Sequence, residues 1–423
     1  MSKYIIRGGE RLNGTVRISG AKNAVLPMLA AMLLTQKECV IRDTPRLRDV
    51  SVMIEILKKL GADVQERMDE DTGSLSLVVN PFRIITHEVE ENLTRAMRSS
   101  IFLMGSLLGR LGKVRVAYPG GCDIGPRPID LHLRGLAALG AEISEKFGYI
   151  HAEAKKLTGT EIHLDFPSVG ATENIMMAAV LAEGTTVIRN AAKEPEIVDL
   201  QNFLNAMGAN VKGAGMDLIR IEGTSRLGGC EHQVIPDRIE TATFMIAGAI
   251  TGGDIYLDNV IPEHVESVSA KLRESGVLVE EKTGKLHVAC DRRPSAVDVK
   301  TLPYPGFPTD VQPQIMALMS ISEGTSVITE TVFENRFKHA DELRRMGANI
   351  KIEGRTAVVK GTRDLFGACV EATNLRSGAA LVLGGLVAEG LTTVEGVEHI
   401  ERGYEDFDLK LRSLGARIQK LAG

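Results

Sequence analysis

The hydrophobic pattern of this chain repeats six times along its length. In each copy, apolar residues at helical spacing end in the phrase Leu-x-x-Leu/Met-Gly-Ala or a weaker form of it, and alternating apolar and polar residues follow. Glycine suits the left-handed position that ends a helix, and alternation at a period of two is typical of a half-buried strand. Each copy therefore predicts an amphipathic helix that ends at its glycine and leads into a strand. The six glycines, separated by 68 to 79 residues, are Gly61, Gly140, Gly208, Gly276, Gly347 and Gly415.

A second pattern lies between several of these copies. Glu-Gly followed by a stretch rich in β-branched residues occurs at 183–188, 323–328 and 389–394. Such residues favour strands, so each stretch predicts a helix that ends at Gly and a strand that follows it. Repeated units of roughly 70 residues are longer than the ~20–45 residues usual in solenoids. We therefore predict an α/β protein of six similar units in two halves, and a cleft between such halves is a common ligand site.

The composition excludes several classes of function. The chain has 423 residues, enough for two domains of ordinary size, and 44% of them are hydrophobic, which is normal for a globular protein. Aromatic residues make up 4%, there is no Trp, and the net charge is -5. The core must therefore be aliphatic, and nucleic acid is not expected as a partner. The apolar runs are too short to span a bilayer, which predicts no membrane insertion.

The cysteine pattern points to a reducing compartment. The cysteines are odd in number, lie far apart and form no CxxC pair, which argues against a disulfide framework. The first residues do not have the pattern of a signal peptide. We therefore predict a reduced, cytoplasmic protein. The five cysteines are Cys39, Cys122, Cys230, Cys290 and Cys369.

One of these cysteines lies in an unusual segment. Residues 118–128 are rich in Gly and Pro, which disfavour a regular helix or strand, and they include Cys122 and Arg127. Because a nearby guanidinium stabilises a thiolate, a cysteine displayed in such a loop predicts a reactive thiol. An incidental loop cysteine is the alternative that these residues leave open.

Cations recur at the expected starts of helices. Lys22 and Asn23 follow a Gly just before an apolar run, and Arg98 lies at the start of another apolar helix. A helix amino terminus together with a cation suits an anion. A solvated lysine, or an arginine that caps a neighbouring helix, gives the same pattern. Three further arginines precede expected helices: Arg336, Arg376 and Arg402. A surface position is the alternative for Arg336 and Arg402.

Two further segments are candidates for proton transfer or ligand binding. Three prolines and a glycine stiffen the approach to Thr309 and Asp310, where a helical pattern begins. Asp310 is compatible there with a helix cap and with a rigidly held general base. His132, which follows the Gly/Pro-rich segment, is more typical of a hydrogen-bonded structural residue than of a ligand. No second His or Cys lies at metal-ligand spacing, so no metal site is predicted.

The loop cations of this acidic chain favour small anionic substrates such as phosphates and carboxylates. The chain has no Walker A loop and no Gly-x-Gly-x-x-Gly, so neither a P-loop nor a Rossmann nucleotide site is supported. The cations that favour an anionic substrate are Lys22, Arg98, Arg127, Arg336 and Arg402.

Taken together, five motifs resemble those of one enzyme family, the UDP-N-acetylglucosamine 1-carboxyvinyltransferases. These enolpyruvyl transferases begin bacterial peptidoglycan synthesis. The motifs occur in the family order and cover essentially the whole chain. They are Ser-Gly-Ala-Lys22-Asn23-Ala, Gly-Gly-Cys122-x-Ile-Gly-x-Arg127-Pro-x-Asp-Leu-His132, Pro-Gly-Phe-Pro-Thr309-Asp310, Glu-Asn-Arg336-Phe and Arg402-Gly-Tyr.

The resemblance implies a fold, a division into domains and a reaction. The fold is a two-domain inside-out α/β barrel, in which each domain has three βαβαββ units with its helices inside. One domain would hold residues 22–235 with the Cys122 loop, and the other residues 1–21 and 236–423, with the active site in the cleft between them. The reaction would transfer the enolpyruvyl group of phosphoenolpyruvate to the 3′-hydroxyl of UDP-N-acetylglucosamine and release phosphate, with no cofactor. The family's link to cell wall biogenesis, cell shape, cell cycle and division, and its inactivation by fosfomycin, would follow.

The same resemblance implies roles for the motif residues. Cys122 would be the general acid of a flexible loop, able to form a covalent adduct with phosphoenolpyruvate, and Asp310 the base for the sugar hydroxyl. Arg336 would lie near the nucleotide or support a closed form. The cations that hold phosphoenolpyruvate would be Lys22, which also counts as catalytic, Arg127 and Arg402. The other expected substrate contacts are Asn23, Arg98, Pro128, Ile129, Asp130, Leu131, His132, Ser168, Val169, Gly170, Thr309, Val332 and Asn374.

Two departures from the family pattern bear on this site. Phe166-Pro-Ser-Val-Gly170 stands where the family often has Lys-Val-Ser-Val-Gly, so a cationic contact near the uridine is missing. Asn374 stands where the family usually has Asp, which removes a carboxylate beside the phosphoenolpyruvate site. Asn374 is also the only support for an alternative, a catalytically idle paralogue that binds the sugar nucleotide and regulates. A second alternative, the sister enzyme 5-enolpyruvylshikimate 3-phosphate synthase, is disfavoured because its Gly-Asn-Ala-Gly-Thr motif is absent.

Overall fold

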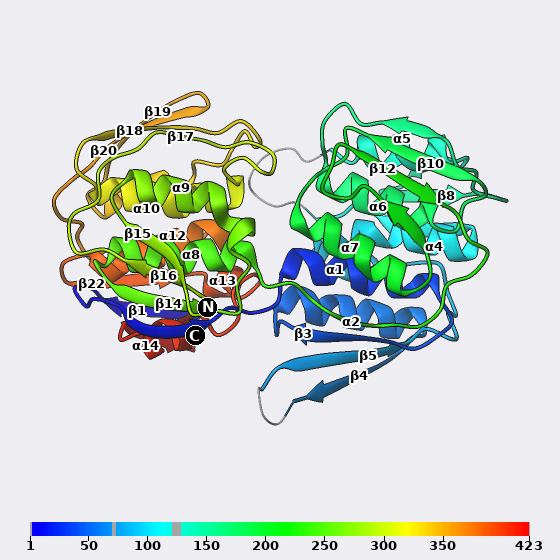
Figure 1. The fold of residues 1–423 in the computed structure, drawn as a ribbon, viewed down its shortest axis with the longest axis horizontal. Coiled ribbons are helices and arrows are strands. Elements are labelled where there is room, and N and C mark those ends of the chain that lie inside the picture. Colours follow the sequence, from blue (N-terminus) through cyan, green and yellow to red (C-terminus); the bar gives the residue numbers. More distant parts are fainter. Residues whose placement is uncertain (1, 70–72, 121–127, 423) are drawn as a thin grey trace. The chain divides into compact units, whose positions relative to one another are not determined.

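The computed structural model of the protein describes residues 2–69, 73–120 and 128–422 (Figure 1). These residues form two compact units. The C-terminal unit takes in the start of the chain up to Ser19 and the residues from Pro236 onwards, and the N-terminal unit takes in the described residues from Gly20 to Ile235. None of the helices in the described ranges is long and apolar enough to cross a membrane.

Three four-stranded sheets belong to the C-terminal unit, and each combines one parallel pair of neighbouring strands with two antiparallel pairs. The strands at the start of the chain enter two of these sheets. The sheets, in strand order, are β21 (Cys369–Glu371), β22 (Leu391–Glu395), β1 (Lys3–Arg7) and β23 (Arg417–Leu421); β15 (Leu278–Lys282), β16 (Lys285–Ala289), β14 (Asp254–Asp258) and β2 (Asn13–Arg17); and β17 (Val299–Lys300), β18 (Thr325–Thr329), β20 (Thr356–Lys360) and β19 (Asn349–Glu353).

The sheets of the N-terminal unit follow the same plan. Two have one parallel and two antiparallel pairs, and the third has three antiparallel strands. In strand order they are β11 (Asn210–Lys212), β12 (Leu218–Glu222), β10 (Thr185–Arg189) and β9 (Glu161–His163); β13 (Glu231–Gln233), β3 (Cys39–Thr44), β5 (Leu75–Asn80) and β4 (Asp63–Met68); and β6 (Lys113–Ala117), β8 (Tyr149–Glu153) and β7 (Glu142–Lys146).

Three helices pack on one another inside each unit, and most of their residues are buried. A helix that is apolar on every side is expected in such an interior position. Figure 1 shows α8, α10 and α12 with strands of their unit around them. The interior helices are α1 (Lys22–Ala31), α4 (Leu103–Leu111) and α6 (Val169–Ala179) in the N-terminal unit, and α8 (Arg238–Ile250), α10 (Gln312–Ile321) and α12 (Leu375–Val387) in the C-terminal unit.

Six further helices are followed by the six glycines of the repeated phrase, and all six glycines have φ between 89° and 107°. A strand follows each glycine, namely β4, β7, β11, β15, β19 and β23. The predicted α/β class with six similar helix–strand units is therefore confirmed. The six helices are α2 (Arg48–Leu60), α5 (Asp130–Ala138), α7 (Pro195–Ala206), α9 (Glu266–Glu274), α11 (His339–Arg345) and α14 (Phe407–Ser413).

Each unit has its own core, made mainly of aliphatic side chains as the composition predicts. Short helical turns connect the larger elements and hold several of the candidate residues. They are η1 (Met32–Leu34), α3 (Glu91–Ala96), η2 (Arg98–Phe102), η3 (Pro262–Val265), η4 (Thr309–Val311) and α13 (Val397–Ile400).

Candidate active site

In the C-terminal unit, Asp310 is held by two buried arginines. It lies in η4, which runs directly into α10, and its Oδ1 accepts a hydrogen bond from Arg336 Nη2 at 2.7 Å. Its Oδ2 accepts bonds from Nη2 and Nε of Arg376 at 3.2 and 3.3 Å. The Asp310 side chain is 30% exposed, whereas Arg336 and Arg376 are 3% and 2% exposed. Neither η4 nor α10 has a side-chain cap, so the helix-cap interpretation of Asp310 is wrong.

The neighbouring side chains orient the guanidinium of Arg376 and determine how much positive charge surrounds Arg336. The guanidinium of Arg376 lies 5.3 Å from the ring centroid of Tyr404, whose hydroxyl accepts a hydrogen bond from Gln314. Burial, together with the charge of Arg336, lowers the pKa of His339 to about 3, so His339 is neutral and adds no third positive charge. Nearby opposite charges favour the ionised form of a carboxylate, which is the form a general base needs. The surface alternative for Arg336 is therefore wrong.

Asn374 caps the helix that carries Arg376. Its Oδ1 accepts hydrogen bonds from the backbone N–H groups of Arg376 and Ser377 at 3.1 and 3.0 Å, and its Nδ2 donates to Ser377 Oγ at 2.7 Å. Asn and Asp are both strongly preferred at this position of a helix. The departure from the family's Asp therefore preserves the cap at the start of α12.

Thr309 and Val332 meet on one buried carboxylate that the sequence analysis missed. Thr309 Oγ1 donates to Glu330 Oε2 at 2.9 Å, and the backbone N–H of Val332 donates to Glu330 Oε1 at 2.8 Å. Glu330 follows β18 directly in a polar, β-branched stretch, and no motif marks it. The C-terminal unit thus brings Thr309, Asp310, Val332 and Arg336 together.

Arg402 lies near the same cluster, in the turn between α13 and α14. It is half-buried, so a fully exposed surface position is excluded. The next residue, Gly403, packs against the start of α12. A Cβ at Gly403 would lie 2.2 Å from Leu375 Cδ1 and 3.6 Å from Arg376 Nη1. This close approach places the Arg402 turn beside the arginine that holds Asp310.

In the N-terminal unit, Lys22 begins α1 and is buried. Its Nζ lies 2.9 Å from Asp49 Oδ2, in the first turn of α2, and the two side chains are 10% and 4% exposed. The alternative of a solvated lysine at a helix start is therefore wrong. Asn23, the next residue of α1, is half-buried.

The starts of α5 and α6 and the end of η2 meet in the same unit. His132 of α5 places Nδ1 3.1 Å from Asn174 Nδ2 of α6, and that amide also donates to the carbonyl of Ile101 in η2 at 3.0 Å. A Cβ at Gly170 would lie 3.1 Å from His132 Cε1, so glycine permits this contact. His132 is a buried, hydrogen-bonded residue, as its sequence context favours.

Ser168 begins α6, where its Oγ accepts from the N–H of Ala171 at 3.4 Å. The structure thereby brings the Arg98 segment, the Pro128–His132 segment and the Ser168–Gly170 segment together. Converging helix starts present backbone N–H groups, which suit the oxygens of an anion or a sugar. Phe166, where the family often has Lys, is exposed.

One expected substrate contact at the start of α5, Asp130, is bound to another side chain. The carboxylate of Asp130 accepts a hydrogen bond from Arg134 Nη2 at 2.8 Å, and Arg134 also binds Asp165. Ile129 is buried, Leu131 is half-buried and Pro128 is exposed. Cys122 and Arg127 lie outside the described residues.

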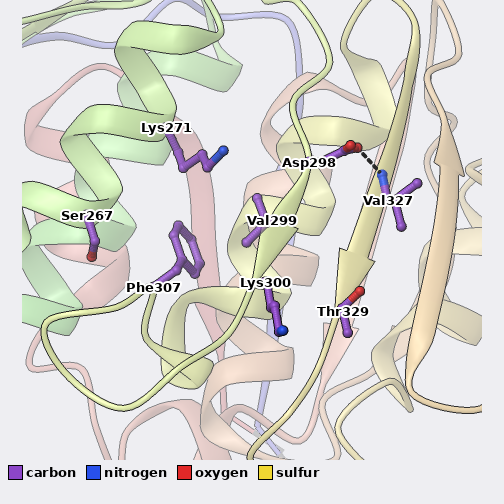
Figure 2. A pocket seen from close by; sticks show the side chains of 8 residues that line it. All are labelled: Ser267, Lys271, Asp298, Val299, Lys300, Phe307, Val327 and Thr329. Carbon is purple, nitrogen blue, oxygen red and sulfur yellow. Dashed lines mark hydrogen bonds between the residues drawn. The ribbon is translucent and has the colours of Figure 1, made fainter.

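A cavity in the described part of the C-terminal unit is separate from these candidates. It has a volume of about 440 Å³, and Figure 2 shows the ring of Phe307 lying between Ser267 and Val299. Of its lining residues, Phe307 alone belongs to a motif. The others are Ser267, Lys271, Asp298, Val299, Lys300, Val327 and Thr329. Within the described ranges, no group of three or more acidic, His or Cys side chains is placed to hold a metal ion.

A family model and solved structures define the class of protein to which this fold belongs. Residues 6–411 match the family model for EPSP synthase (3-phosphoshikimate 1-carboxyvinyltransferase). The enolpyruvyl transferase NikO from Streptomyces tendae has a TM-score of 0.88 at 24% identity, covering 100% of this chain and 99% of that one. EPSP synthase from Acinetobacter baumannii has a TM-score of 0.76 at 19% identity, covering 100% of both chains. These structures show that the fold is that of the enolpyruvyl transferases.

Sequence relatives narrow the class. The chain is 63% identical to UDP-N-acetylglucosamine 1-carboxyvinyltransferase 1 of Symbiobacterium thermophilum, over 99% of this chain and 95% of the relative. It is 57% identical to the enzyme of the same name from Caldanaerobacter subterraneus subsp. tengcongensis, over 99% of both chains. It is 52% identical to UDP-N-acetylglucosamine 1-carboxyvinyltransferase of Halothermothrix orenii, over 100% of both. The chain belongs to the UDP-N-acetylglucosamine 1-carboxyvinyltransferase family.

Proposed function

We propose that this protein transfers the enolpyruvyl group of phosphoenolpyruvate to the 3′-hydroxyl of UDP-N-acetylglucosamine and releases phosphate. The observation that carries the proposal is identity of 52–63% to relatives of that name over nearly their whole length. The solved EPSP synthase from Acinetobacter baumannii is only 19% identical, which favours the sugar nucleotide over shikimate 3-phosphate as the acceptor. No cofactor takes part.

The held carboxylate of Asp310 suits it to accept the proton of the sugar hydroxyl. The hydroxyl oxygen would bond to C2 of phosphoenolpyruvate while Cys122 protonates C3. Loss of a proton from C3 and breakage of the bond between C2 and the phosphate oxygen would then restore the double bond and release phosphate. Proton transfer by such positioned groups typically contributes ~10²–10⁴ to the rate.

The candidate residues fall into one group that suits phosphoenolpyruvate and another that suits the sugar nucleotide. The phosphate and carboxylate of phosphoenolpyruvate would be held by Lys22, Arg127 and Arg402. The sugar nucleotide would take its contacts from the N–H groups and side chains at the starts of η2, α5 and α6, and from Thr309 and Val332.

The two domains would be residues 22–235, and residues 1–21 with 236–423, with the site in the cleft between them.

The proposal extends to the place of the protein in the cell. Family membership supports a cytoplasmic enzyme of peptidoglycan synthesis, with consequences for cell wall biogenesis, cell shape, cell cycle and division. A catalytically idle paralogue is not favoured, because Asn374 keeps the cap of α12 and leaves Arg376 bound to Asp310.

The test is a phosphate-release assay with a choice of acceptor. The proposal predicts phosphate release when phosphoenolpyruvate and UDP-N-acetylglucosamine are both present, and none with either substrate alone. Shikimate 3-phosphate in place of the sugar nucleotide should give none. Release with shikimate 3-phosphate would favour the sister reaction, and binding of UDP-N-acetylglucosamine without release would favour the idle paralogue.

Cys122 gives a second test through fosfomycin, whose phosphonate resembles the phosphate of phosphoenolpyruvate. We expect time-dependent inactivation that is faster with UDP-N-acetylglucosamine present, and an adduct on Cys122. Among the other thiols, Cys39 and Cys290 are buried, and the hydrogen bond with Cys39, together with burial, raises the pKa of Cys230. Cys369 is exposed and is the internal control for simple accessibility. An adduct on any other cysteine, or none, would refute the role of Cys122.

A further inference from the structure

Glu330 is a buried carboxylate whose oxygens are fully occupied by neutral donors. It is 1% exposed and directly follows β18. Its Oε1 accepts from the backbone N–H groups of Val332 and Phe333 at 2.8 and 3.2 Å, and from Thr301 Oγ1 at 2.8 Å. Its Oε2 accepts from Thr309 Oγ1 at 2.9 Å. Hydrogen bonds to an ionised acceptor are stronger than neutral ones, and four of them offset the cost of burying the carboxylate.

Three of these bonds, from Thr309, Val332 and Phe333, connect the two segments that supply the Asp310–Arg336 pair. Thr309 immediately precedes Asp310, and Val332 and Phe333 immediately precede the turn that carries Arg336. The pair itself closes the arrangement, because Arg336 Nη2 donates to Asp310 Oδ1 at 2.7 Å. Glu330 is therefore bonded to both segments at once.

We propose that Glu330 is a positioning residue for enolpyruvyl transfer, which sets the placement of Asp310 and of the Val332 backbone. The inference rests on the proposed function, in which Asp310 is the base and Thr309 and Val332 contact the sugar nucleotide. Glu330 acts through these groups and does not touch the reacting atoms. A displacement of ~1 Å in such a group can cost about a hundredfold in rate.

The geometry distinguishes two substitutions of Glu330. In Glu330→Gln, the amide oxygen can take the place of Oε1 and keep three donors, while the amide nitrogen faces Thr309 Oγ1, which can rotate to accept. In Glu330→Ala, all four bonds are lost and both segments are released. We expect a small effect from Gln and about a hundredfold loss of kcat from Ala.

Thr301 provides a second pair of variants outside the substrate contacts. Its Oγ1 donates to Glu330 and accepts from the backbone N–H of Thr331 at 2.9 Å. Thr301→Val keeps the shape and removes both bonds, and should lower kcat roughly twofold to tenfold. Thr301→Ser keeps the hydroxyl and should restore the rate. Glu353→Gln, at an exposed glutamate of β19 paired with Lys351, is the matched control and should leave kcat unchanged.

The experiment measures phosphate release at varied pH and at varied concentrations of both substrates, phosphoenolpyruvate and UDP-N-acetylglucosamine, for each folded variant, with the melting temperature as the check of folding. Glu330→Ala should lower kcat far more than it raises the KM for phosphoenolpyruvate. In the pH profile of kcat for this variant, the fall in rate at low pH should move to higher pH, because Asp310 loses its ion pair with Arg336. A purely structural role of Glu330 would change the melting temperature and leave the low-pH side of the kcat profile unchanged.

The outcomes separate the inference from the proposed function. Unchanged kcat and pH profile in folded Glu330→Ala overturns the inference while wild-type turnover stands. If Glu330→Ala does not fold, a folded Thr301→Val with wild-type kcat overturns it instead. If the wild-type protein itself releases no phosphate, the proposed function fails. A crystal structure of Glu330→Ala, or of Thr301→Val where Glu330→Ala does not fold, then decides the inference, which is contradicted if Asp310 and Thr309 keep their wild-type positions.

Discussion

The candidate residues of the two units are held in different ways. In the C-terminal unit, side chains fix one another: Asp310 is bound by two buried arginines, and Glu330 accepts four hydrogen bonds. In the N-terminal unit, most candidates lie at or just before the starts of η2, α5 and α6, where the first backbone N–H groups have no partner within the helix. Lys22 is the exception, because it is paired with Asp49.

Two buried glutamates make the same contrast. Glu330 has both oxygens occupied, whereas neither side-chain oxygen of Glu173, in α6, has a hydrogen-bond partner in the described structure. Burial, with the nearby carboxylates of Glu196 and Glu194, raises the pKa of Glu173 well above its usual value. Among the described candidates, the C-terminal unit thus holds a fixed cluster of charged side chains, whereas the N-terminal unit holds mainly helix starts. The following changes test this division, from the largest expected effect to the smallest.

Asp310→Asn should have the largest effect. The amide keeps the shape of the side chain but removes its basicity, and loss of a general base typically costs ~10²–10⁴ in rate. Steady-state phosphate release measures this loss, and calorimetry should show that UDP-N-acetylglucosamine still binds. Near-normal turnover would mean that the two arginines hold Asp310 for structural reasons alone.

Lys22→Ala should have the next largest effect. Removing a charge-assisted contact costs roughly 1.5–3 kcal/mol, which corresponds to about tenfold to hundredfold weaker binding of phosphoenolpyruvate. Because this change leaves Asp49 buried without Lys22, the double variant Lys22→Ala with Asp49→Asn is the control for stability. Calorimetry in the presence of UDP-N-acetylglucosamine gives the affinity, and an unchanged value refutes a phosphate contact by Lys22.

Glu173→Gln should change stability in a pH-dependent way. The raised pKa of Glu173 means that the folded state retains a proton which the unfolded state loses, so its contribution to stability falls as pH rises above about 4.5. Glutamine does not titrate, and its advantage in melting temperature over the wild type should therefore grow from pH 5 to pH 8. A difference that is constant with pH would show that Glu173 is not protonated in the fold.

Changes at Asn374 should have the smallest effect. Asn374→Ala removes the cap of α12 and should cost ~1 kcal/mol of stability. Asn374→Asp keeps the cap and adds a negative charge at a helix start, which should be neutral or stabilising by ~0.3–1 kcal/mol. Denaturant unfolding measures both. A large loss of turnover in Asn374→Asp would contradict a role limited to capping.

The sequence predicts the fold more fully than the site. The six helix-ending glycines mark the six repeated units, because the backbone at each position is left-handed and few other residues adopt that conformation. Stiffening by prolines also marks Asp310 correctly as a rigidly held residue. The partners of Asp310 could not be predicted, because Arg336 and Arg376 lie 26 and 66 residues away and meet it only in the fold.

Residues that act through buried hydrogen bonds leave still less trace in the sequence. Glu330 and Asn174 each join three chain segments, yet neither stands in a pattern that distinguishes it from an ordinary polar residue beside an apolar run. Lys22 was marked as a cation at a helix start, but its burial and its pairing with Asp49 depend on how α1 and α2 pack. Such contacts depend on the tertiary structure of each unit and cannot be predicted from the local sequence.

The most direct test of enolpyruvyl transfer is the mass of the sugar nucleotide after incubation with phosphoenolpyruvate and the wild-type protein. We expect UDP-N-acetylglucosamine to gain one enolpyruvyl group for each phosphate released, and Asp310→Asn to give little of this product in the same time. An unchanged sugar nucleotide under conditions in which both substrates bind would contradict the proposed function.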